Sequence, residues 1–236
     1  MDGFAAAASA LSQMESADDE LTAPILEAIP VTGAAISTLG DFLGTQTVEA
    51  SDQLAARLDE VQFDAGEGPC WDALALRAPV LQPDLQATMQ RHWPAFADAV
   101  AAQEIGALFA FPLLIGPLRI GALDLYTVQP MELGTRDTKR SEVLASIVSR
   151  HVLRRAMQTA DSVIDTAEDR APNSRRIIHQ ATGFVIAQLG ISAEDAHLLI
   201  QGQAFAQSRS MREIAEDLLA RRLSFERADN AIEDAR

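Results

Sequence analysis

Cys70 is the only cysteine of the 236-residue chain, and it stands directly after Gly66-x-Gly68 and Pro69. The proline marks a helix start, and a helix N-terminus lowers the pKa of a thiol, so a redox-active thiol is one interpretation. A small buried thiol that only packs is the other. The glycines lack the third glycine of a dinucleotide-binding fingerprint. A lone cysteine also excludes an internal disulfide and a cysteine-cluster metal site.

The other residue types that commonly do chemistry form no recognisable site. The four histidines have no metal-ligand spacing; they are His92, His151, His179 and His197. The sequence contains no phosphate-cradling glycine loop, no nucleophile elbow and no kinase signature. We therefore expect neither a metal site nor an enzyme.

A group of aromatic side chains around Cys70 could line a pocket for a small molecule. The candidates are Cys70, Trp71, Trp93, Phe96 and Phe111. Aromatic residues at helical spacing also serve as plain core, which is the alternative interpretation. Nothing in the sequence names the ligand or any cofactor.

The elements that must position these side chains follow from apolar periodicity. The residues from about 20 to 136 alternate between strand and short-helix patterns, including an amphipathic helix expected over 92–104. Two long apolar runs meet at Gly116-Pro117 and are typical of central strands covered on both sides. Pro112 inside the first run indicates an edge or a bulge. We predict an α+β fold with helices packed on an antiparallel sheet.

A helical connector is expected next, because apolar residues then recur every three to four positions. A stripe this narrow suits a seam against a partner helix, and it predicts a homodimer. Its members are Val143, Leu144, Ile147, Val148, His151 and Val152. His151 on this seam could respond to pH, although a partly exposed polar seam residue is the plainer interpretation.

Three short helices are predicted after Pro172, with no strand signal beyond Asp137. Gly190 suits a left-handed helix end, and Ser192 and Ser210 each begin a capping-box pattern. Phe205 is among the expected core residues of this bundle. The predicted organisation is a helical or flexible N-terminal segment 1–19, an α+β domain 20–136, a helical connector 137–171 and a three-helix bundle 172–236.

Charge is distributed unequally between these regions. The chain has a formal net charge of −15, yet residues 172–236 hold eight basic and nine acidic side chains. Nearly all of the net negative charge therefore lies in residues 1–171. An acidic surface disfavours non-specific nucleic-acid binding there, whereas the bundle is close to neutral. No run reaches the length of a membrane span and the N-terminus lacks a basic flank, so we expect a cytoplasmic protein with no membrane partner.

Two stretches of the sequence resemble known domains. The run FDAGEGPCWDALALRAPVLQPDL, with RHWPAFADAV and FAFPLLIGPLRIGALDLY, resembles a GAF sensor domain of the type fused to transcription regulators in actinobacteria. The run HQATGFVIAQLGISAEDAHLLIQGQAFAQSRSMREIAEDLL resembles an ANTAR domain, the RNA-binding module of antitermination regulators. The resemblance implies a sheet of about six strands flanked by helices, a connector that pairs in a dimer, and an all-α bundle that binds RNA.

The ANTAR resemblance also implies a partner, a tandem stem-loop in a nascent transcript, which two copies of the module would hold. The family usually has basic residues where this chain has Thr182, Gln201 and Gly202, so charge-assisted phosphate contacts are fewer. Gly183 is better explained by close helix approach than by RNA contact. The candidate RNA-binding residues are Arg175, Arg176, His179, Gln180, Thr182, Gly183, Gln201, Arg209 and Arg212; for any arginine, a solvated helix face is the alternative.

Two further functions remain open on the sequence. One is a ligand- or redox-sensing dimer whose bundle has lost RNA affinity and serves protein interaction or autoinhibition. The other is a haem or flavin sensor, because some GAF domains hold such cofactors.

Overall fold

The computed structural model describes residues 3–16, 19–40, 43–162, 173–207, 209–228 and 231–235, with the side chains of 159–162, 173–176 and those beyond 225 left aside. The chain divides into two compact units, Met1–Arg170 and Ala171–Arg236.

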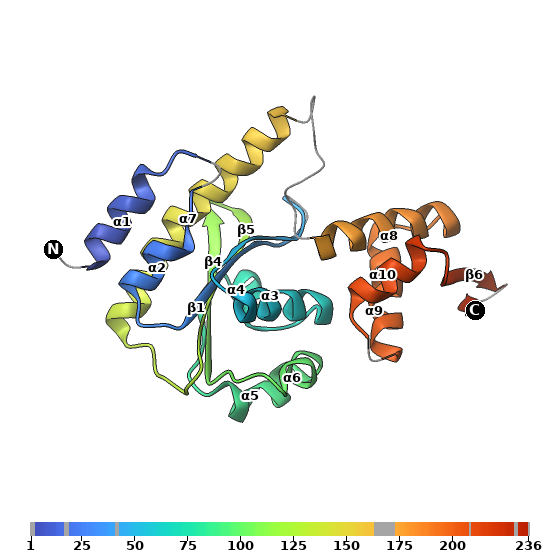
Figure 1. Ribbon diagram of the computed structural model, residues 1–236, viewed down its shortest axis with the longest axis horizontal. Coiled ribbons are helices and arrows are strands. Elements are labelled where there is room, and N and C mark those ends of the chain that lie inside the picture. Colours follow the sequence, from blue (N-terminus) through green and yellow to red (C-terminus); the bar gives the residue numbers. More distant parts are fainter. Residues whose placement is uncertain are drawn as a thin grey trace. The chain divides into compact units, whose positions relative to one another are not determined.

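The first unit is built on a five-stranded antiparallel sheet whose strand order is β2-β1-β5-β4-β3 (Figure 1). The strands are β1 (Gly33–Thr38), β2 (Gln46–Ala50), β3 (Val80–Gln82), β4 (Ala107–Ile115) and β5 (Leu118–Thr127). The two apolar runs form the central hairpin β4–β5, as predicted, and most of their side chains are buried. β3 pairs with β4 only at Leu108, Phe109 and Ala110. Pro112 lies beyond this pairing, at an edge of the sheet, so its missing N–H removes no hydrogen bond between β3 and β4.

Helices cover both faces of this sheet (Figure 1). One face is covered by α1 (Gly3–Gln13), α2 (Thr22–Ala28) and α7 (Thr135–Ser162), and the other by α3 (Gln53–Ala65), α4 (Pro69–Leu76), α5 (Leu85–His92) and α6 (Pro94–Val100). The result is a three-layer α+β unit, in agreement with the predicted fold class.

Local chemistry fixes where α3 begins and ends. Asp52 caps the helix by accepting a 2.9 Å hydrogen bond from the Ala55 amide, and the Tyr126 hydroxyl on β5 donates to the same carboxylate at 2.9 Å. Burial raises the pKa of Asp52, but its hydrogen bonds outweigh that effect and the net pKa is lowered. Gly66 ends the helix with φ of +67°, a conformation that favours glycine.

The helix expected over 92–104 is wrong in its bounds. Within this range only α6, Pro94–Val100, is helical beyond His92, where α5 ends, because Pro94 lacks the N–H that a continuous helix needs and instead starts a new helix. Asp84 caps α5 by accepting from the Ala87 amide at 3.2 Å. The sheet also has five strands, one fewer than the resemblance implied.

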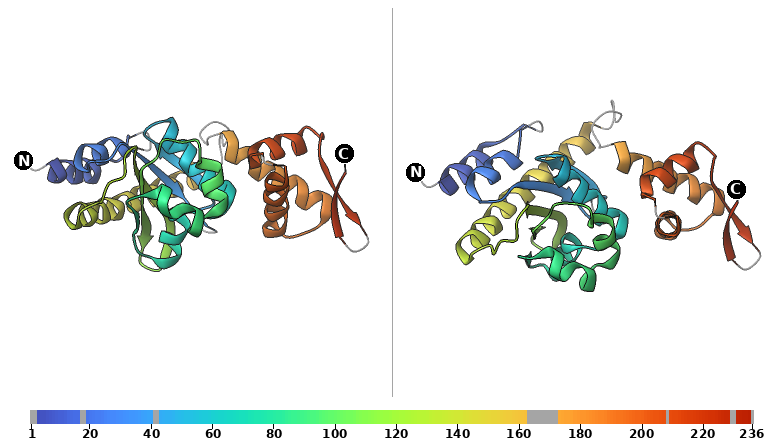
Figure 2. Two further views of the ribbon diagram at one scale, coloured as in Figure 1. Left: turned by 90° about the horizontal axis from the view of Figure 1, so that it is seen from below. Right: turned by 60° about the horizontal axis from the view of Figure 1, so that its bottom comes forward.

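The second unit contains the three predicted helices and an additional hairpin (Figure 2). The helices are α8 (Asn173–Leu189), α9 (Ala193–Ala206) and α10 (Met211–Leu219), and the strands are β6 (Ser224–Ala228) and β7 (Ala231–Ala235). Ser192 and Ser210 cap α9 and α10 as predicted, and Gly190 has φ of +65°. The expectation of no strand after Asp137 is wrong, because β6 pairs with β7.

Candidate functional site

The candidate RNA-binding residues of the second unit do not share one exposed face. Thr182 is buried, and its hydroxyl donates to the Ile178 carbonyl of its own helix at 2.9 Å. This corrects its placement on an RNA-contacting surface: it faces the bundle core together with Ala181 and Val185. His179 and Gln180 are exposed on α8, and Gln201 is half-buried on α9.

The close-approach explanation for Gly183 is also wrong. Gly183 is exposed, and a Cβ atom built there would meet nothing within 4 Å. Gly202 in the middle of α9 is likewise exposed, with open space at the same position. Both glycines therefore leave the backbone of a surface helix accessible.

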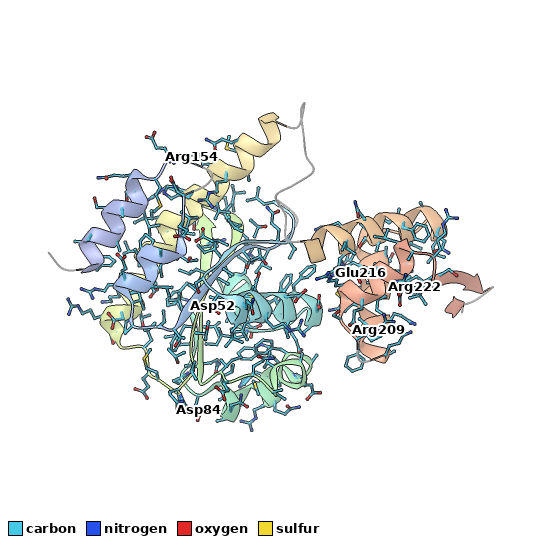
Figure 3. All side chains as sticks on the ribbon, viewed as in Figure 1. Asp52, Asp84, Arg154, Arg209, Glu216 and Arg222 are labelled. Carbon is cyan, nitrogen blue, oxygen red and sulfur yellow. The ribbon has the colours of Figure 1, made fainter. Side chains whose placement is uncertain are left out.

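The candidate arginines whose side chains the structure describes form ion pairs with acids of α10. Figure 3 labels Arg209, Glu216 and Arg222 in this region. Arg209 contacts Asp217 at 2.8 Å and Arg212 contacts Glu216 at 2.9 Å. Arg222 is a second partner of Asp217, at 2.7 Å. These arrangements favour the solvated-face interpretation for Arg209 and Arg212. Arg175 and Arg176 lie in α8, and their side chains are outside the described residues.

Tertiary packing brings together two histidines that are distant in the sequence. His197 on α9 is half-buried, and burial lowers the pKa of its imidazole; the charge of His179 on α8 lowers it further. Sequence spacing could not reveal this, because the helices that carry the pair meet only after folding. In the described residues, no group of three or more His, Cys, Asp or Glu side chains is arranged to hold a metal ion.

The aromatic pocket candidates of the first unit are divided among three clusters. Phe111 packs on the sheet face that carries α7, whereas Trp93 and Phe96 pack on the opposite face with α3 and α6. Cys70 and Trp71 belong to a third, smaller cluster beside β5. Phe111 therefore does not share a pocket with the other four residues, whereas Trp93 lies beside α4, where its Nε1 donates to Asp72 at 3.1 Å. The burial of Phe96, Phe111 and Trp93 fits the plain-core interpretation.

A buried polar network that the sequence reasoning missed lies between β5, α3 and α4. Gln62 donates from Nε2 to the buried carboxylate of Asp124, and its Oε1 accepts from the Cys70 amide at 2.9 Å. Its backbone carbonyl accepts from Trp71 Nε1 at 2.8 Å. Gly68 makes room for Gln62, because a Cβ there would lie 2.6 Å from Gln62 Cγ. The network thus joins a central strand to the first turn of α4.

Asp124 is the titratable centre of this network. Burial raises the pKa of its carboxyl to about 7; the nearby charge of Asp59 adds to the increase, and the hydrogen bond from Gln62 opposes it. Its Oδ1 atom accepts no hydrogen bond from the described residues. The signal available in the sequence was a single acid inside the continuous apolar run ALDLY. Cys70 is itself fully buried, which does not fit an exposed reactive thiol.

The predicted dimer seam is used inside the first unit instead. Leu144, Ile147, Val148 and Val152 pack into the core that α7 forms with the sheet, and His151 is buried beside α1, hydrogen-bonded to the Leu11 backbone. Of the six seam residues only Val143, 47 % exposed, points outward. This corrects the seam assignment, because side chains buried within the unit are not available to a partner helix.

The surroundings of His151 also differ from those expected on a seam. Burial lowers the pKa of its imidazole, and the charges of Arg154, Arg155 and Arg150 lower it further, while the hydrogen bond with Leu11 opposes them.

In the described residues, no single helix is both long enough and apolar enough to cross a membrane.

Comparison with known proteins connects these two units to known domains. Residues 167–219 match the family model of the ANTAR domain. No curated protein sequence matches the chain.

Solved structures resemble the first unit. The GAF domain of a phosphoenolpyruvate-protein phosphotransferase from Acinetobacter has a TM-score of 0.51 at 11% identity, covering 71% of this chain and 96% of its own. The GAF domain of the corresponding protein from Coxiella burnetii also scores 0.51 at 11% identity, covering 67% and 95%. Free methionine-R-sulfoxide reductase from Neisseria meningitidis scores 0.50 at 15% identity, covering 66% and 89%. The chain combines a GAF-fold unit with a C-terminal ANTAR domain.

Proposed function

We propose that this chain is a cytoplasmic, homodimeric regulator that binds tandem stem-loop RNA through its ANTAR domain and promotes transcription antitermination. In this proposal the GAF-fold unit senses a signal whose identity is open, and the chain is not an enzyme. The observation that carries the proposal is the ANTAR match over 167–219, which coincides with a folded helical bundle. A regulator with a GAF sensing domain is the architecture that the match and the fold together support.

The bundle sets the expected mode of binding. With eight basic and nine acidic side chains in 172–236, and with Arg209 and Arg212 already paired to acids, few cations remain for phosphates. Recognition would depend on unpaired loop bases, which are accessible in RNA stem-loops. We expect an affinity that falls only weakly with salt, with a slope of log K against log salt shallower than about −2, since each neutralised phosphate of single-stranded RNA contributes roughly −0.7.

The test is binding of the full chain to RNA carrying two stem-loops, compared with the same RNA whose loop sequences are scrambled. We expect preference for the intact loops at low salt. Gln180→Arg on α8 should increase affinity about tenfold, because position 180 is exposed and an added guanidinium can contact phosphate. Gln203→Arg on α9 is the matched control for unspecific charge. Equal binding to intact and scrambled loops, or no binding at low salt, would refute the proposal.

Homodimerisation is tested separately. Light scattering of the full chain should report about twice the 25.4 kDa chain mass at micromolar concentration. A mass that stays at one chain over the whole accessible concentration range would contradict it.

A further inference from the structure

The outer side of α9 is apolar, which is unusual for a surface helix. The inner side packs in the bundle through Ala196, Ile200 and Ala204. On the outer side Leu198 is 55 % exposed and Phe205 is 76 % exposed. No Asp, Glu, Lys or Arg occurs from 196 to 206. A helix that is apolar on both sides is typically covered on both sides. Within the second unit, only the inner side of α9 is covered.

The centre of this surface is open to close approach. Gly202 lies between Leu198 and Phe205 at helical spacing, and it leaves space where a side chain would stand. Gly in a helix interior costs about 1 kcal/mol relative to Ala. It also lets a second helix approach the backbone closely at a crossing point. We call Leu198, Gln201, Gly202 and Phe205 the outer stripe.

The outer stripe is self-complementary in an antiparallel arrangement. A two-fold axis between positions 201 and 202 places Leu198 of one copy opposite Phe205 of the other, and Gln201 opposite Gly202. Both pairs then occur twice, as an isologous interface requires. The two Leu198–Phe205 pairs lie on either side of the two Gly202 residues. The helices therefore cross at Gly202, where no side chain covers the backbone.

The charges at the two ends of α9 match the same arrangement. Glu194 and Asp195 are exposed at the start of the helix. Arg209 lies at its end, where its amide donates to the Ala204 carbonyl at 2.9 Å. Arg209 and Arg222 both contact Asp217, and Glu213 lies near Arg209; residues 209–222 hold four basic and three acidic side chains, so this end is weakly positive. An antiparallel crossing brings the acidic start of each copy toward the basic end of the other.

We propose that the outer stripe of α9 is a self-association surface, which pairs with the same stripe of a second copy of this chain. An uncharged stripe that exposes Leu198 and Phe205, with charged residues at its margin, has the composition of a protein interface core and rim. RNA fits this stripe less well, because α9 offers no Lys or Arg to neutralise phosphate. The inference does not depend on RNA binding.

A cysteine-crosslinking experiment on the full chain tests the crossing point. Cys70 is fully buried, so Gly202→Cys introduces the exposed thiol. Gly183→Cys is the matched control, since Gly183 is also an exposed helix glycine with open space. Under a mild thiol oxidant we expect Gly202→Cys to form disulfide-linked dimers at least tenfold faster than Gly183→Cys. Adding Phe205→Glu to Gly202→Cys should reduce the rate to the control level, whereas Leu76→Glu, at a 69 % exposed leucine of the first unit, should not.

The crosslinking rates and an RNA-binding assay together show whether a second copy of the chain or RNA covers the outer stripe. Equal rates for Gly202→Cys and Gly183→Cys would overturn the proposal. Equal rates together with loss of RNA binding in the Phe205→Glu chain would assign the stripe to RNA. Fast crosslinking at position 202 without RNA binding at low salt would support self-association and refute the proposed RNA function instead.

Discussion

Replacing Asp124 by Asn should change how the stability of the first unit depends on pH. The carboxyl is buried in the sheet, and its pKa is raised from 3.8 to about 7. Between these two pH values the folded state binds a proton that the unfolded state has released, so the free energy of unfolding falls as pH rises. At 1.36 kcal/mol per unit of pKa, the difference corresponds to about 4 kcal/mol.

Asn keeps the shape and still accepts the hydrogen bond from Gln62, but it has no charge to bury. We expect Asp124→Asn to match the natural chain near pH 4 and to exceed its free energy of unfolding by about 4 kcal/mol at pH 8, with the gap opening by about 1.4 kcal/mol per pH unit between. Urea unfolding followed by tryptophan fluorescence measures this selectively, because both tryptophans, Trp71 and Trp93, lie in the first unit.

Asp84→Asn is the matched control for an acid-to-amide change. Asp84 is exposed and caps α5, a role that Asn also performs, so its effect should be small. Parallel stability profiles for the natural chain and Asp124→Asn from pH 5 to pH 8 would refute the account of a buried, proton-holding carboxyl.

Three further predictions concern other positions. Asp52→Ala should lower the free energy of unfolding in urea by about 2 kcal/mol, because it removes the α3 cap. The stabilisation by Asp52 should be lost as pH falls through its lowered pKa. A decrease of less than about 0.5 kcal/mol would contradict the capping role. Thr182→Lys should lower the thermal midpoint of the helical circular-dichroism signal, whereas Thr182→Val should not, since the site is buried; equal midpoints would place position 182 at the surface. Cys70 should react with an aromatic disulfide reagent only after urea unfolding, and rapid reaction of the folded chain would contradict its burial.

Local patterns in the sequence predicted the elements well where a single principle governed them. Continuous apolar runs identified β4 and β5, and serine caps identified the starts of α9 and α10, because these signals act within a few residues. The bounds of α6 were missed because the apolar spacing around Trp93 continues across the break that Pro94 imposes. The β6–β7 hairpin was missed because its strands are short and only weakly alternating.

The candidate sites were predicted less well, because they depend on which side of an element faces the core. Periodicity placed Val148 and Val152 on one face of a helix but did not distinguish a sheet from a partner helix as the surface beneath it. It likewise gave Phe205 to the bundle core, although that side chain is exposed. The Asp124 network was not accessible to pattern analysis at all, because Gln62, Cys70 and Asp124 meet only through the tertiary fold.

The burial of α7 has a mechanical consequence. Since its apolar side chains are held by the sheet and by α1, the helix turns only as a rigid rod together with the layer beneath it. Its 28 residues span about 42 Å, so each degree of tilt about the first turn moves the last turn by about 0.7 Å. A tilt of about 3° would therefore displace the C-terminal end of α7 by about 2 Å.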